Sequence, residues 1–148
     1  MSFLSLGLAP ELQQALKVCG YEKMTPVQKQ AIIPARQGKD ILVTAQTGTG
    51  KTAAFSLPII QKIIDTPTEN KEGSPRALIL SPTRELAEQL SKTIETYAQF
   101  LSLNIVALYG GVKMGGQENK LRAGVDILIA TPGRLLEHLS KCNLSLSQ

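Results

Sequence analysis

Short apolar runs alternate with helical patterns along most of the chain. The apolar runs predict buried strands at residues 41–43, 77–80, 105–108 and 127–130. Helical periodicity predicts helices over residues 10–19, 51–64, 82–100 and 132–140, and a further helix that begins at Pro26. Strands that alternate with helices are typical of a parallel sheet covered on both faces. The pattern therefore predicts an α/β fold of three layers, helix–sheet–helix, with a mostly parallel sheet.

The start of the second helix carries several local signals. Thr25 is a good N-cap, Pro26 suits the first helical position, and Gln28 completes a capping box. Pro58 should bend the helix in which it lies. Residues 65–75 are polar and rich in turn formers, which predicts a mobile surface loop.

The composition is ordinary for a soluble domain, with 148 residues, 43% apolar and 19% charged. No segment approaches the roughly 20 apolar residues that span a bilayer, and the N-terminus lacks the pattern of a signal peptide. Cys19 and Cys142 belong to no motif, and two reduced thiols fit a cytoplasmic protein. The net charge of +4 is compatible with an anionic partner but does not identify one.

A phosphate-binding loop (P-loop) directly follows the first predicted strand. Small residues let backbone N–H groups approach phosphate oxygens, and the following helix directs its N-terminal dipole at them. Lys51 can reach the β- and γ-phosphates, and the Thr52 hydroxyl can hold Mg²⁺. The alternative is a glycine-rich turn with a chance Gly-Lys-Thr. The loop comprises Ala45, Gln46, Thr47, Gly48, Thr49, Gly50, Lys51 and Thr52.

Two later strands end in a second shared pattern. A hydroxyl residue, a proline and an arginine occur in Ser81-Pro82-Thr83-Arg84 and again in Thr131-Pro132-Gly133-Arg134. A proline in the first helical turn leaves the other free N–H groups pointing outward, where they bind phosphates. Because such starts share the carboxyl edge of a parallel sheet, this edge is expected to hold a nucleotide and, beside it, another polyanion. Ordinary N-capping with solvated arginines remains the alternative.

Two further side chains are expected to have no catalytic role. His138, the only histidine, lies in a helical pattern without a partner cluster and is predicted to be solvated, with no catalytic or metal role. Glu85 is predicted to form an ion pair within its helix.

Together these segments resemble the N-terminal RecA-like domain of a DEAD-box ATP-dependent RNA helicase, closest to bacterial RhlE-like members. The resemblance covers nearly the whole chain, so residues 1–148 are expected to be the N-terminal part of the first RecA-like domain, without the second. Met24 stands where the family often has proline. The matching segments are Phe3, the Q motif at residues 20–28, motif I at residues 45–52, motif Ia at residues 82–87, the glycine doublet Gly110-Gly111, and motif Ib at residues 131–134.

The resemblance implies a role for each motif. Gln28 would read adenine, Tyr21 and Phe3 would frame the base, and Lys51 and Thr52 would act on the phosphates of ATP and its Mg²⁺. Backbone contact with RNA implies little sequence specificity. For Gln28 the capping role stays open beside adenine reading. The RNA-contacting residues would be Pro82, Thr83, Arg84, Gly110, Gly111, Thr131, Pro132, Gly133 and Arg134.

The chain ends before the family's Asp-Glu-Ala-Asp strand, which supplies catalytic carboxylates. In the family's sheet order, the missing strands lie between the P-loop strand and the strand before motif Ia. The full-length protein is therefore expected to be a monomeric, RNA-dependent ATPase that separates short RNA duplexes. These 148 residues alone are expected to be inactive and to self-associate through exposed strand edges. The alternatives are a nucleotide-responsive RNA-binding module without hydrolysis and, less in keeping with motifs Ia and Ib, another P-loop NTPase.

Overall fold

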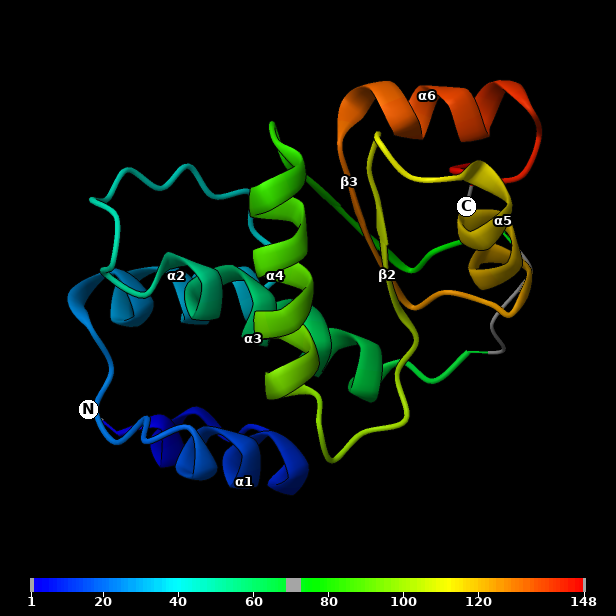
Figure 1. Ribbon diagram of the computed structural model, residues 1–148. Coiled ribbons are helices and arrows are strands. Elements are labelled where there is room, and N and C mark those ends of the chain that lie inside the picture. The colour runs from blue at the N-terminus through cyan, green and yellow to red at the C-terminus, as the bar shows by residue number, and fades with distance from the viewer. Residues whose placement is uncertain (1, 69–72, 148) are drawn as a thin grey trace. The chain divides into compact units, whose positions relative to one another are not determined.

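The structure, a computed structural model, describes residues 2–68 and 73–147 in two compact units. The first unit runs up to Pro67 and takes in Thr96–Leu101, and the second holds Thr68–Glu95 and the residues from Ser102 onward. Figure 1 traces the chain through both. The mobile loop predicted at residues 65–75 includes residues 69–72, which lie outside the described residues.

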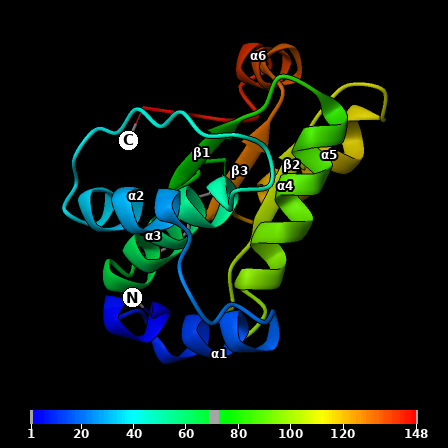
Figure 2. The same cartoon turned by 90° about the vertical axis from the view of Figure 1, so that its left-hand side faces the viewer.

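The first unit is helical. The helices predicted in this region are confirmed, and α2 and α3 pack against each other (Figure 2). The capping box is present, with the Thr25 hydroxyl accepting from the Gln28 N–H and the Gln28 side chain accepting from the Thr25 N–H. Helix α3 continues through Pro58. The elements are the 3₁₀ helix η1 (Phe3–Leu6), α1 (Pro10–Val18), α2 (Pro26–Arg36) and α3 (Lys51–Asp65).

The strand predicted at residues 41–43 is wrong. These residues adopt no regular structure, and Ile41, Leu42 and Val43 are 40%, 97% and 40% exposed. A strand forms only by exchanging hydrogen bonds with a neighbour, and the three strands of the described sheet pair with one another alone. The segment instead lines a hollow of about 650 Å³ beside α2.

The second unit contains a parallel sheet of three strands in the order β1-β3-β2. The strands β1 (Ala77–Leu80), β2 (Ile105–Leu108) and β3 (Ile127–Ala130) coincide with the predicted runs. Central β3 is buried at every position. Along β1, Leu78 and Leu80 are 36% and 57% exposed. These two side chains of the edge strand β1 are therefore more exposed than any side chain of β3.

Three helices accompany this sheet: α4 (Arg84–Tyr97), α5 (Met114–Arg122) and α6 (Pro132–Ser140). Helix α6 has the predicted bounds, and α4 is shorter than predicted at both ends. Helix α5 was not predicted, because its Met-Gly-Gly start and polar composition give little periodicity. Figure 1 shows α5 beside β2. The core of the unit is formed by Val106, Leu108, Leu121, Val125, Leu128, Ala130, Leu135 and Leu144.

The prediction that His138 is solvated is wrong, since its side chain is fully buried. His138 lies three residues after the core residue Leu135 and shares its helix face. Its Nε2 lies 3.1 Å from the Gln117 Oε1, whereas Nδ1 has no partner among the described residues. Burial lowers the pKa of the imidazole, and the nearby Arg134 guanidinium acts in the same direction.

A neutral, buried His138 predicts that the chain loses stability in mild acid. The unfolded chain binds the proton more tightly than the folded one, so stability falls as the pH drops below the ordinary histidine pKa of 6.5. Urea unfolding followed by circular dichroism, at about pH 7.5 and about pH 5.5, measures the loss. The His138→Gln variant lacks the titrating group and should lose less stability over this interval. Equal losses in both proteins would contradict the assignment.

Candidate functional site

The P-loop is a tight turn that leads into α3. Residues 47–50 form the turn, and Gly48 and Gly50 have φ of 78° and 88°, a left-handed conformation that favours glycine. Gly50 is the N-cap of α3, and no side chain caps the helix. The first N–H groups of α3 are therefore directed toward the loop without a side-chain acceptor, an arrangement that suits an anion.

Lys51 and Thr52 stand at the first two positions of α3, and both are half-buried. The Lys51 ammonium donates to the Ala45 carbonyl and so spans the loop from end to end. The Thr49 hydroxyl donates to the Gln46 carbonyl at 2.7 Å and closes the turn. An ammonium has three donors, so Lys51 can serve a phosphate oxygen from the position that it holds.

Gln28 joins α2 to the P-loop. Its side chain is 1% exposed; Oε1 accepts from the Thr25 N–H at 2.9 Å and Nε2 donates to the Gly50 carbonyl at 3.2 Å. A Cβ at Gly50 would overlap the Gln28 Nε2, so any larger residue at this position would have to displace the Gln28 amide. The amide retains one N–H and one lone pair. The capping role is confirmed, while adenine reading stays a prediction that these free positions permit.

Phe3 and Tyr21 belong to a cluster of aromatic rings. Phe3 is 3% exposed and meets Tyr21 edge-on, with centroids 5.8 Å apart. The hydroxyls of Tyr21 and Tyr97 lie 2.8 Å apart, and burial raises the pKa of Tyr97. Phe3 therefore packs against the Tyr21 ring and stabilises its position. Stacking of either ring on a base stays a prediction.

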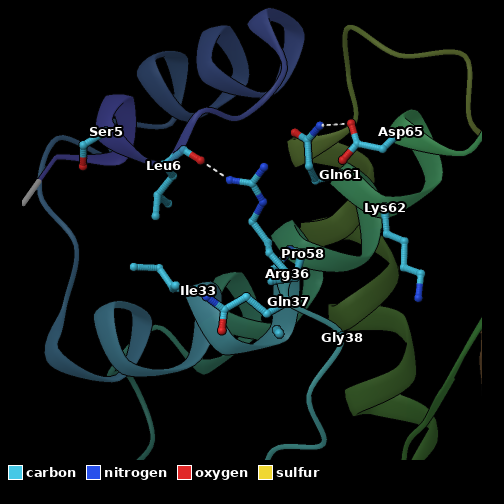
Figure 3. Close-up of a pocket in the computed structure, with 11 residues that line it drawn as sticks. Ser5, Leu6, Ile33, Arg36, Gln37, Gly38, Pro58, Gln61, Lys62 and Asp65 are labelled. Carbon is cyan, nitrogen blue, oxygen red and sulfur yellow. Dashed lines mark hydrogen bonds between the residues drawn. The ribbon is translucent and has the colours of Figure 1, made fainter.

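A second pocket of the first unit, about 400 Å³, contains none of the predicted site residues (Figure 3). Arg36 reaches back to donate to the Leu6 carbonyl. Gln61 accepts from the Ala9 N–H at 2.7 Å and donates to Asp65 at 2.8 Å. These polar groups fasten the N-terminal segment to α2 and α3. The Leu6 and Ala9 partners are distant in the chain from Arg36 and Gln61, so the sequence carried no local signal for these two contacts.

In the second unit, three strand ends converge as predicted. The parallel register aligns Leu80, Ala130 and Leu108, so the residues that follow leave one edge of the sheet. The Ser81 N–H donates to the Ala130 carbonyl, and the Thr131 N–H to the Leu108 carbonyl, both at 2.9 Å. This edge thus gathers motif Ia, motif Ib and residues 109–112, here termed the glycine loop. The P-loop belongs to the other unit, so a shared edge with it stays a prediction.

The start of α4 differs in detail from its prediction. The helix begins at Arg84, so Pro82 precedes the first turn and does not lie within it. Thr83 caps the helix, because its hydroxyl accepts from the Leu86 N–H at 3.2 Å. The ion pair predicted for Glu85 is not found among residues 2–68 and 73–147; in this helix Arg84 pairs with Glu88, with Nε and Oε1 3.2 Å apart.

Arg84 is held against the glycine loop, while about half of its side chain remains exposed to solvent. The guanidinium lies over the Tyr109 ring, 5.1 Å from its centroid, and 46% of the side chain is exposed. A Cβ at Gly111 would lie 2.9 Å from the Arg84 Nη1, and Gly111 has φ of 81°. A hydrogen bond from Tyr109 and the charge of Arg84 lower the pKa of Glu88. Arg84 is therefore an oriented and accessible cation.

Arg134 has a different environment, and the alternative of a solvated arginine fails here. Only 10% of its side chain is exposed. Its Nη1 donates to the Val112 carbonyl at 3.0 Å and to the Gln117 Oε1 at 3.1 Å. Its Nε lies 2.8 Å from the Glu137 carboxylate, close enough for an ion pair but not aligned for a hydrogen bond. Arg134 thus ties α6 to the glycine loop and to α5.

The start of α6 offers backbone donors. Pro132 occupies the first turn, and the Thr131 side chain does not cap the helix. Gly133 is exposed, and a methyl group on its Cα would have no neighbouring atom within 4 Å. The N–H groups of Gly133 and Arg134 precede the first intrahelical bond, which Leu135 makes to Thr131. Both N–H groups are therefore open to a ligand.

Residues 25–148 match the family described as DEAD/DEAH box helicase. The chain belongs to this family. It is 45% identical over 141 residues to ATP-dependent RNA helicase SrmB of Haemophilus influenzae, covering 95% of this chain and 32% of that protein. It is 42% identical to DEAD-box ATP-dependent RNA helicase 9, mitochondrial, of Arabidopsis thaliana, covering 100% of this chain and 24% of that protein. The chain thus spans about a quarter to a third of the length of these relatives.

Solved structures place the fold in the same family. The RNA helicase Prp28 of Chaetomium thermophilum, bound to ADP, is 39% identical, with a TM-score of 0.90 over 99% of this chain and 36% of that one. The RecA-like α/β fold is therefore confirmed, and the RhlE-like subtype stays a prediction. No helix in residues 2–68 or 73–147 has the length and apolarity required to cross a bilayer.

Comparison of the single variants Gly48→Ala and Gly50→Ala distinguishes the effect of backbone strain from that of steric overlap in the P-loop. Both positions have left-handed φ, so each substitution should cost about 1 kcal/mol of unfolding free energy or more. Only Gly50→Ala also collides with Gln28. It should therefore destabilise the chain further and displace the Gln28 side chain. Thermal unfolding of the two variants measures the difference, and equal destabilisation would contradict the Gln28–Gly50 contact.

Proposed function

We propose that the chain is the ATP-binding and RNA-backbone-binding part of an RNA-dependent ATPase that separates short RNA duplexes. The observation that supports this proposal most directly is the start of α3, which no side chain caps and which follows two glycines in the left-handed conformation. The Lys51 side chain crosses the same loop. Membership of the DEAD/DEAH box helicase family supports ATP and RNA as its ligands. Residues 1–148 are then the N-terminal part of a first RecA-like domain.

At the P-loop, the first N–H groups of α3 and the Lys51 ammonium bind the triphosphate. Residues 45–52 line the phosphates, and the Thr52 hydroxyl, at the second position of α3, is placed to hold Mg²⁺. Mg²⁺ held there would supply positive charge that offsets the charge of the phosphates. The chain's own contribution is to orient the nucleotide and stabilise its charge.

Gln28 makes the site prefer adenine. Its remaining N–H and lone pair can pair with the donor and acceptor on an adenine edge, while its other two bonds hold it against Thr25 and Gly50. Tyr21, supported by Phe3, lies beside the base. A guanine edge presents the opposite polarity at the exocyclic position and leaves the buried amide mismatched.

RNA binds at the strand ends of the second unit. Arg84 is oriented toward solvent by Tyr109 and Glu88 and supplies a cation for a phosphate. The free N–H groups of Gly133 and Arg134 supply neutral donors. These groups contact sugar and phosphate and read no base, so the binding has little sequence specificity. Contacts from Pro82, Thr83, Gly110, Gly111, Thr131 and Pro132 complete the proposed track.

Hydrolysis needs a base that positions water and cations that stabilise the transition state. The 148 residues contain no Asp-Glu-Ala-Asp sequence. We infer that these groups come from other parts of a longer, monomeric and cytoplasmic protein. The apolar residues 41–43, exposed here, would pair with its further strands or, in the isolated chain, with a second copy.

ATP turnover tests the proposal. The full-length protein should hydrolyse ATP faster with single-stranded RNA present, and Lys51→Ala should lower the rate by about 100-fold or more. The isolated 148-residue chain should show no turnover above its own Lys51→Ala control and should form oligomers in light scattering. RNA binding by the full-length protein with no hydrolysis would favour the alternative of a nucleotide-responsive binding module.

Nucleotide selectivity tests the role of Gln28 separately. Calorimetry on the isolated chain should give an affinity for ATP at least about tenfold higher than for GTP, since one mismatched buried polar group costs over ~1 kcal/mol. Gln28→Ala should abolish this ratio. Gln30→Ala, an exposed position on the same helix, should preserve it. Equal affinities of the wild-type chain for ATP and GTP would refute adenine reading.

A further inference from the structure

A buried amide on α5 connects the elements that carry the proposed RNA contacts. Gln117 is 6% exposed. Its Nε2 donates to the Tyr109 carbonyl at 3.0 Å. Its Oε1 accepts from the Arg134 Nη1 at 3.1 Å and lies 3.1 Å from the His138 Nε2. One side chain therefore links the start of the glycine loop, at Tyr109, to two turns of α6.

The hydrogen-bond partners of the Gln117 amide allow it only one orientation. A backbone carbonyl can only accept and a guanidinium can only donate, so Nε2 must face Tyr109 and Oε1 must face Arg134. Oε1 then also accepts from His138, which requires the proton of a neutral imidazole on Nε2. The unpartnered Nδ1 of His138 is thus a bare lone pair, and a protonated ring would bury an N–H without an acceptor among the described residues.

The same elements orient the groups proposed to meet RNA. Tyr109, whose carbonyl Gln117 holds, carries the ring beneath the Arg84 guanidinium. Arg134, whose guanidinium Gln117 also holds, reaches the Val112 carbonyl at the far end of the glycine loop. The loop is therefore fixed at both ends through Gln117, directly at Tyr109 and through Arg134 at Val112.

We propose that Gln117 is a positioning residue for RNA binding. Its burial keeps it from touching RNA, and it acts by holding the glycine loop and the first turns of α6 in one arrangement. The inference rests on the proposed function, since it assumes that Arg84 and the start of α6 contact RNA. Without Gln117 the glycine loop would become ordered only when RNA binds. The free-energy cost of that ordering would lower the affinity for RNA.

The test measures RNA affinity of the full-length protein by fluorescence anisotropy. The probe is a labelled single-stranded RNA of about ten nucleotides, a length near the site sizes of nucleic-acid channels, with a non-hydrolysable ATP analogue present. Gln117→Met keeps the size of the side chain and removes its hydrogen bonds. We expect roughly tenfold weaker RNA binding and unchanged affinity for the nucleotide analogue. The matched control is Gln89→Met, on α4 outside the network, which should bind RNA as wild type does.

The salt dependence separates positioning from direct contact. Arg84→Ala removes a cation and should lower the slope of log affinity against log salt by about 0.7 for each phosphate that the side chain neutralises. Gln117→Met changes no charge and should keep the wild-type slope at lower affinity. Val125→Ala destabilises the same core without touching the network and controls for reduced stability. It should retain wild-type RNA affinity under conditions where all variants are folded.

The outcomes distinguish the two proposals. If the wild-type protein binds RNA and Arg84→Ala weakens it, while Gln117→Met binds as tightly as wild type, the positioning role is overturned and the proposed function stands. The positioning role is also overturned if Val125→Ala weakens binding as much as Gln117→Met does. If the wild-type protein does not bind the RNA, the proposed function fails, and this inference fails with it.

Discussion

Parallel pairing of β1 and β2 to a fully buried β3 is the constraint on which the second unit depends. Along β2 buried positions alternate with partly exposed ones, so a slip by one residue would move its apolar side chains out of the core, and the register is strongly specified. Because all three run in one direction, their carboxyl ends meet at one edge. Motif Ia, the glycine loop and motif Ib, which are far apart in the chain, become neighbours for this reason alone.

A second constraint recurs in both units: a buried amide must satisfy its donors and acceptors. Gln28 bonds the Gly50 carbonyl and Gln117 bonds the Tyr109 carbonyl. In each case the amide belongs to a helix residue and holds a neighbouring loop that contains glycine. A loop proposed to bind phosphate cannot be stabilised by bulky side chains at the point of contact. The shape of such a loop is therefore fixed by a buried side chain that bonds to the backbone of the loop.

The two arginines of motifs Ia and Ib illustrate how similar sequences acquire different roles. Arg84 lies over an aromatic ring and keeps about half of its side chain open. Arg134 donates its Nη1 to a carbonyl and an amide and is nearly buried. The first is suited to attract a polyanion. The second is suited to order the surface that receives it, and the backbone N–H groups beside it are the more accessible donors.

Local rules in the sequence determined the starts of α1, α2, α3 and α6, three of the four predicted strands, the P-loop and the family. Capping residues, prolines and apolar runs act over a few neighbours, which is why α6 and the Thr25–Gln28 capping box agree with prediction. The tertiary structure decided what depends on distant partners. Residues 41–43 are apolar enough for a strand, yet find no neighbour to pair with among the described residues. Burial of His138 and Arg134, and the positions of Gln28 and Gln117 behind their loops, follow from which faces other elements cover, and no local pattern encodes that.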